Sequence, residues 1–188
     1  MAIDFSQVKT ITIPEGSVKK ITDSAGAILW KENLVGWHTI WEGNKTCSIK
    51  FNGDNVTPTI TGNENNFAQT VSGTGYTPKI RITFSYSITS HFNSLVDTFY
   101  LNDSRLTTFP SSPITIDAVE DTSTNRLCGP CVSPSNFSAY ARVTLVSKKD
   151  TVNNRLNFDL EAKNYSLQYG YSPNFTATLT VTKIEQYY

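Results

Sequence analysis

Apolar and polar residues alternate along much of the sequence after residue 36, and a period of two is the pattern of β-strands. The longest example runs from Ile80 to Ile88, where Ile, Phe or Tyr occupies every second position and Arg, Thr or Ser lies between. This arrangement gives a strand one buried face and one solvated face. The same alternation recurs in residues 47–51, 114–118, 139–145, 156–160 and 175–182.

Short polar segments rich in Asn, Gly, Ser, Pro and Asp separate these runs, and such residues favour turns. Charged residues make up only 17% of the chain, because Thr, Ser and Asn take their place on the expected strand faces and turns. We therefore expect an all-β domain of roughly nine to ten strands, arranged as an antiparallel β-sandwich that resembles a jelly roll.

The segment His91–Leu101 fits two kinds of secondary structure. Its apolar residues have the spacing of a helical face, which would allow a short helix before the turn at Asn102. The segments on both sides are predicted strands, so we favour a strand at Asp97–Leu101 over the helix. The apolar residues concerned are Phe92, Leu95, Val96, Phe99 and Tyr100.

The N-terminal stretch Val8–Trp30 has a pattern of its own. Turn signals at 14–16 and 23–26 divide it into three short strands, at residues 8–13, 18–22 and 27–30. So small a ribbon buries too little apolar surface to offset the conformational entropy of folding, so it must dock either on the following domain or on another protein. We predict a docking segment at residues 1–32 and a sandwich domain at residues 33–188. The side chains expected to dock are Ile11, Ile13, Val18, Ile21, Ile28, Leu29 and Trp30.

Cys128 and Cys131 enclose Gly and Pro, which is the pattern of thioredoxin-type redox sites. That chemistry needs the first thiol at a helix N-terminus, and the following Val-Ser-Pro-Ser-Asn does not begin a helix. We expect a local disulfide across a loop or two free thiols. A zinc site completed by Cys47 and either His38 or His91 would lack the second paired cluster that such sites normally show. We predict Cys47 in the core, and no metal, cofactor or catalytic residue.

Two tryptophans near the start of the predicted domain have alternative interpretations. Trp37 and Trp41 are predicted to lie on one strand face with Thr39. Either they pack in the core or they stack on sugar rings, in which case Trp37, Trp41 and Tyr76 would form a glycan-binding site. We interpret the loop carboxylates as turn residues rather than as a calcium site or a glycosidase pair. They are Asp54, Asp103, Asp117, Glu120 and Asp121.

The charge balance limits the range of partners. The chain has 16 basic and 16 acidic residues, and no basic patch interleaved with aromatic residues is visible in the sequence. Without a long-range field, neither nucleic acid nor membrane is an expected partner. The first ten residues, MAIDFSQVKT, lack the regions of a secretory signal, and no apolar run is long enough to span a bilayer. We expect a soluble protein made in the cytoplasm.

Three segments carry a family resemblance: IPEGSVKKITDSAGAILWK at 13–31, TIWEG at 39–43 and TVTKIEQYY at 180–188. They resemble small virion proteins of tailed phages and prophages of Gram-positive gut bacteria, in which a short β segment precedes a β-rich body. The resemblance implies synthesis in the host cytoplasm and assembly into a virion as a structural, tail-associated or appendage protein. It implies no catalytic residues.

These observations support two functional hypotheses. The first is a non-enzymatic virion component, a tail or capsid appendage attached to other virion proteins through its N-terminal β segment, which can also be a host-surface adhesin. A homo-oligomer is expected for it, and a trimer by analogy with phage appendages. The alternative is a carbohydrate-binding β-sandwich module that binds a host-surface glycan.

Overall fold

A computed structural model describes residues 20–22, 28–31, 36–52, 57–71, 78–90, 95–117, 124–134, 139–165 and 174–187. Within these residues the chain forms strands and connecting turns and no helix, so the predicted all-β class is confirmed. No helix in this described part is long and apolar enough to cross a membrane. The chain divides into two compact units, residues 1–35 and 36–188.

The first unit contains a short antiparallel hairpin. Strand β1 (Lys20–Thr22) pairs with β2 (Ile28–Lys31), and Ile21 lies opposite Trp30. These strands lie within or overlap the second and third strands predicted for this stretch. The first predicted strand, residues 8–13, lies outside the described residues.

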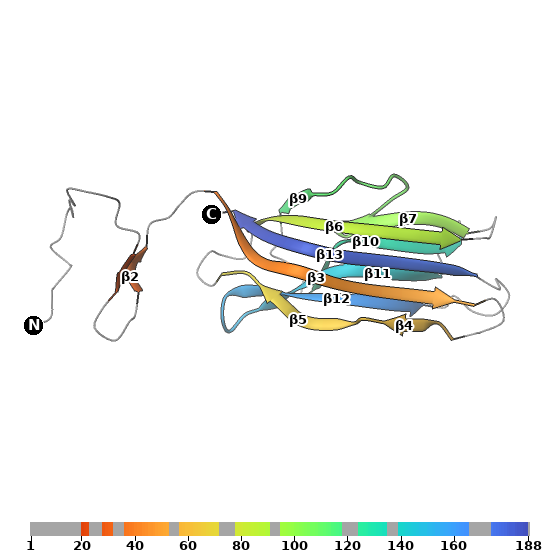
Figure 1. Ribbon diagram of the computed structural model, residues 1–188, viewed down its shortest axis with the longest axis horizontal. Coiled ribbons are helices and arrows are strands. Elements are labelled where there is room, and N and C mark those ends of the chain that lie inside the picture. Colours follow the sequence, from red (N-terminus) through yellow and green to blue (C-terminus); the bar gives the residue numbers. More distant parts are fainter. Residues whose placement is uncertain are drawn as a thin grey trace, which may run out of the picture. The chain divides into compact units, whose positions relative to one another are not determined.

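The second unit consists of two antiparallel sheets (Figure 1). The five-stranded sheet has the order β4–β3–β13–β6–β9 and the six-stranded sheet the order β5–β12–β11–β10–β7–β8. The strands of the first are β3 (Trp37–Phe51), β4 (Thr59–Thr61), β6 (Lys79–Ser90), β9 (Ile114–Asp117) and β13 (Phe175–Tyr187). Those of the second are β5 (Glu64–Gln69), β7 (Leu95–Leu101), β8 (Ser104–Leu106), β10 (Thr124–Pro134), β11 (Tyr140–Asp150) and β12 (Arg155–Tyr165).

The strand order is that of a jelly roll in which one strand is expanded into three. As in a jelly roll, the first strand of the body, β3, pairs with the last, β13, which also pairs with β6. On the other sheet, the strand that would join β5 to β7 is replaced by the meander β10–β11–β12. Strand β12 pairs with β5, and β10 pairs with β7. This expansion and the short strands β4, β8 and β9 explain why the sandwich has more strands than predicted.

The core lies between the two sheets and is built from the alternating apolar residues. Phe51 and Phe175 of the five-stranded sheet lie with ring centroids 5.0 Å apart. Phe84 of β6 stacks on Phe99 of β7 at 5.7 Å, which joins the two layers. Phe158 of β12 is also fully buried. The predicted alternation therefore identifies the inner face of β6, β11, β12 and β13 correctly.

The ambiguous segment 91–101 contains strand β7, so the preference for a strand is confirmed where the structure describes it. Leu95 and Phe99 face the core, and Tyr100 on the opposite face is also buried, at 6% exposed. A strand with apolar residues on both faces loses its period of two. This explains why the sequence imitates a helical pattern here.

The Cys128–Cys131 segment was predicted to be a loop, but it is part of the central strand β10. Gly129 has a φ of 152°, and a Cβ built on it would lie 2.0 Å from the carbonyl oxygen of Val143 on β11. Glycine is therefore required for β10 and β11 to approach this closely. Gly129 is explained by this packing and needs no turn.

Candidate functional site

The predicted glycan-binding tryptophans do not share a strand face. In the pairing of β3 with β13, Glu185 lies opposite Thr39 and Ile184 lies opposite Trp41, so Ile40 is an extra residue in β3. Such a β-bulge reverses the facing of the residues beyond it. Trp37 and Thr39 therefore lie on the outer face of the five-stranded sheet, whereas Trp41 packs against the core. The prediction of a common face was wrong because the extra residue of a β-bulge cannot be recognised from the apolar–polar alternation of the sequence.

Trp37 is half-buried and lies among polar and aromatic neighbours. The Arg81 guanidinium lies 4.0 Å from the centroid of its ring, and the Tyr187 ring meets it edge to face at 5.4 Å. Arg81 is also 3.6 Å from the Glu185 carboxylate. Arg81 and Tyr187 contact the indole and Glu185 holds Arg81, so together they fix the indole at the end of the sheet. Tyr187 remains 42% exposed there.

Trp41 meets the Phe67 ring edge to face at 4.9 Å. The ring also lies close over Gly43, because a Cβ at that glycine would be 2.8 Å from the indole. Trp41 thus closes one side of the core, which was one of its two predicted roles. Tyr76 lies outside the described residues.

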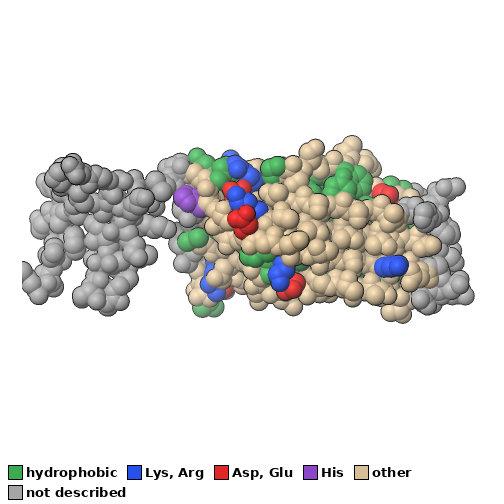
Figure 2. Space-filling view, in the orientation of Figure 1, with side chains coloured by type: hydrophobic (Ala, Val, Ile, Leu, Met, Phe, Trp, Pro, Cys, Tyr) green, Lys and Arg blue, Asp and Glu red, His purple; other side chains and the backbone are tan. Residues whose placement is uncertain are grey.

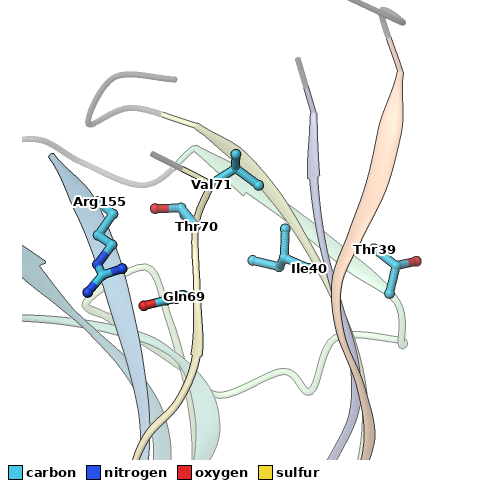
Figure 3. Close-up of a pocket in the computed structure, with 6 residues that line it drawn as sticks. All are labelled: Thr39, Ile40, Gln69, Thr70, Val71 and Arg155. Carbon is cyan, nitrogen blue, oxygen red and sulfur yellow. The ribbon is translucent and has the colours of Figure 1, made fainter. Parts of the chain in front are cut away.

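An open groove of about 410 Å³ lies beside the start of β3, the strand that begins with Trp37 (Figure 3). Thr39 and Ile40 of β3, the end of β5 with the residues that follow it, and Arg155 of β12 line this groove. Figure 3 shows Ile40 directed toward Thr70 and Val71, whereas Thr39 points away from them.

The polar groups of the groove are largely engaged by the protein itself. Thr70 accepts a hydrogen bond from the Leu156 amide at 2.7 Å and donates its own amide to the Leu156 carbonyl at 2.9 Å. The Arg155 guanidinium pairs with Asp150 at 3.0 Å. The groove therefore offers shape and a few contacts rather than a set of convergent catalytic groups.

The outer face of the five-stranded sheet carries rows of hydroxyl side chains. Thr46 and Thr180 are hydrogen-bonded across β3 and β13 at 2.8 Å, and Ser48 bonds Thr61 of β4 at 2.7 Å. Figure 2 shows that charged side chains on this view form separate groups, with largely neutral polar surface between them. The exposed large apolar side chains of the described residues are scattered among several strands and turns. This described surface therefore has no broad apolar patch of the kind that binds partners.

The three cysteines are free thiols, and all three are buried. Cys128 faces the core, whereas Cys131 lies on the outer face of the six-stranded sheet beside Thr98 and Arg142. Two residues three apart in a strand point to opposite sides, so these thiols cannot form a local disulfide or chelate one metal. Among the described residues no group of three or more His, Cys, Asp and Glu side chains is placed to hold a metal ion.

The thiols are also protected against ionisation. Burial raises the pKa of Cys128, and burial together with the Glu161 charge raises the pKa of Cys47 to about 12. Burial raises the pKa of Cys131 as well, against the opposing influence of Arg105, Thr98 and Arg142. Buried thiols of this kind are inert. Cys47 lies in the core, as predicted, where its thiol donates to the Asn63 side-chain oxygen at 3.3 Å.

A cluster that the sequence did not reveal lies on the outer face of the six-stranded sheet. Arg105 of β8, Arg126 of β10 and Arg142 of β11 surround the rings of Tyr100 and Tyr140 at 4.8 to 5.9 Å from guanidinium to ring centroid. The cluster is not visible in the sequence as a basic patch interleaved with aromatic residues. The residues come from four strands far apart in the sequence, and pairing of β8, β7, β10 and β11 brings them together.

Neither a protein-family model nor a curated protein nor a solved structure matches this chain.

Proposed function

We propose that the protein is a non-enzymatic structural component of a phage virion, a tail or capsid appendage attached through its N-terminal β segment. The observation that carries this proposal is the division of the chain into a short N-terminal unit, residues 1–35, and a complete two-sheet body. A two-stranded hairpin such as β1–β2 is marginally stable alone in water, so it gains stability by docking. Jelly rolls are common among viral capsid proteins and lectins.

The described surface of the body supports an attachment role for the N-terminal unit. Its sheet faces carry hydroxyl rows and ion pairs, and its exposed apolar side chains are scattered. By contrast with these scattered side chains, the apolar residues of the stretch 8–30 lie close together in the sequence. Strand addition suits such a ribbon, because an unpaired strand edge extends the sheet of a neighbour through main-chain hydrogen bonds.

The oligomeric state in solution tests this attachment element. We expect light scattering to give the intact protein a mass of three times the 20.9 kDa of one chain. Ile13→Asp and Trp30→Ala should each lower the mass toward that of one chain, because they remove apolar docking surface. Ser48→Ala, on the hydroxyl face of the body, is the control and should keep the assembled mass. Variants at Ile13 and Trp30 that keep the intact mass would show that residues 8–30 do not hold the assembly together.

A carbohydrate-binding role is the second candidate, and the exposed end of the five-stranded sheet favours it. Trp37, Tyr187 and Arg81 form a small aromatic and cationic surface there. Half-buried aromatic rings held in place by neighbours are suited to stacking against a sugar.

A glycan array tests the carbohydrate-binding candidate. If the module binds glycans at this surface, Trp37→Ala should reduce the array signal at least about tenfold, a loss of about 1.4 kcal/mol in binding. Trp41→Phe is the matched control, because Trp41 packs against the core and should leave the signal unchanged. An unchanged signal with Trp37→Ala would exclude this surface.

A further inference from the structure

The outer face of the six-stranded sheet is buried where β10 and β11 pair, although this face of an antiparallel sandwich is normally solvated. Arg142 is 5% exposed, and Thr144 and Val146, which alternate with it on the same face of β11, are fully buried. The opposite face of β11 packs in the core through Val143 and Leu145. Strand β11 is therefore buried on both sides, and its outer side carries an arginine.

The Arg142 side chain is a buried cation with unused donors. Its Nε and Nη1 atoms have no hydrogen-bond partner among the described residues, and neither do the buried hydroxyls of Ser133 and Thr144 on the same face. Arginine is rarely buried without a partner, because an unpaired buried charge is strongly unfavourable. These groups provide donors for a ligand that supplies negative charge.

Partly exposed cations lie around this buried arginine. Arg126 pairs with Asp103 at 2.8 Å and lies 4.8 Å from the Tyr100 ring, with its side chain 34% exposed. Arg105 donates to the Tyr100 hydroxyl at 2.9 Å. The positive potential of three guanidinium groups therefore extends from the surface to Arg142.

An aromatic platform lies beside the cations. The Tyr140 ring is 4.8 Å from the Arg142 guanidinium and stacks on the Tyr165 ring of β12 at 5.6 Å, with 22° between the planes. Tyr165 is 58% exposed, so it offers a ring face to a ligand. Strand pairing fixes the arrangement. Tyr140 lies opposite Tyr165, and Arg142, two residues further along β11, lies opposite Lys163.

We propose that this face binds a sugar that carries a carboxylate or a phosphate, with the anionic group on Arg142 and the sugar ring against Tyr165. Nε and Nη1 of Arg142 are closed to solvent, so binding of the anion requires a neighbouring side chain, such as the half-buried Tyr140 whose ring is 4.8 Å from the guanidinium, to turn aside. The site lies on the opposite sheet from Trp37 and does not depend on the virion role or on the surface at Trp37.

The surrounding charges favour a single anionic sugar over a nucleic acid. Glu161 and Asp159 lie on the outer face of β12. Glu161 pairs with Lys163 at 2.8 Å, and Asp159 pairs with Lys148 of β11. A polyphosphate backbone crossing this face would meet these carboxylates as well as Asp103. The zero net charge of the chain also supplies no long-range attraction for nucleic acid.

Chemical-shift titration by nuclear magnetic resonance tests the site on the intact protein. Glucuronic acid and glucose 6-phosphate should give saturable shifts, whereas neutral glucose should give none. Arg142→Met should weaken the binding of both charged sugars at least about tenfold. It should leave the melting temperature equal or higher, because an unpaired buried charge is removed. Lys50→Met, which removes an exposed cation of β3 in the other sheet, away from both candidate sugar surfaces, is the control and should not change binding.

Tyr165→Ala provides a second variant at an exposed position that leaves the core intact. It should weaken the binding of both charged sugars at least about threefold and leave the binding of inorganic phosphate unchanged. Binding of charged sugars that survives Arg142→Met would overturn the site. Inorganic phosphate that binds as tightly as glucose 6-phosphate would overturn the sugar assignment, and so would a single-stranded oligothymidylate that binds more tightly than either sugar.

Discussion

Gly129→Ala is expected to unfold the protein or to reduce its free energy of unfolding by at least about 4 kcal/mol. The added Cβ would lie 2.0 Å from the Val143 carbonyl oxygen and 2.8 Å from the Thr144 Cα, and backbone atoms of a central strand cannot move aside easily. The φ of 152° adds strain for any residue with a side chain. Because β10 and β11 lie at the centre of the six-stranded sheet, their separation would disrupt the sandwich.

Denaturant titration followed by circular dichroism measures this effect. Ser133→Ala is a control in the same strand, and it should change the free energy of unfolding by less than about 1 kcal/mol because the lost hydroxyl has no partner among the described residues. A Gly129→Ala protein with a cooperative transition within about 1 kcal/mol of the unsubstituted chain would contradict the close approach of β10 and β11.

The sequence predicted the fold well where a strand has one solvated face. In β6 and β13 the polar positions are mostly Thr and Ser that are half-buried or exposed, so the period of two is clear and the inner residues are identified correctly. It predicted poorly where both faces are buried. In β10 nearly every residue is buried, and this removed the alternation and led to the loop prediction for the Cys128–Cys131 segment.

The candidate binding surfaces could be predicted less well than the fold, because they depend on strand pairing. The bulge at Ile40 places Trp41 on the inner face, and no residue type at that position signals the extra residue. The arginine and tyrosine cluster joins positions from Tyr100 to Tyr165, which only the order of strands β8, β7, β10, β11 and β12 brings together. Arg142 in the mostly apolar run Ala-Arg-Val-Thr-Leu-Val was a local signal in the sequence.

The proposed attachment role predicts that deletion of residues 1–32 removes the protein from virus particles without unfolding its body. The two sheets and their core lie within residues 36–188, so the truncated chain should keep a β circular-dichroism spectrum and a cooperative melt. Its docking residues would be gone, so attachment should fall to background. Ser48→Ala in the full chain is the matched control and should be incorporated normally.

The most direct measurement of the proposed role is the amount of this protein in gradient-purified particles released from cells that encode it. Quantitative mass spectrometry determines this amount for the intact chain, the deletion and the control. We predict intact and Ser48→Ala protein at equal levels and the folded deletion at less than about a hundredth of them, which corresponds to at least about 2.7 kcal/mol of lost attachment. Particles that contain the folded deletion at the level of the intact chain would contradict attachment through the N-terminal β segment.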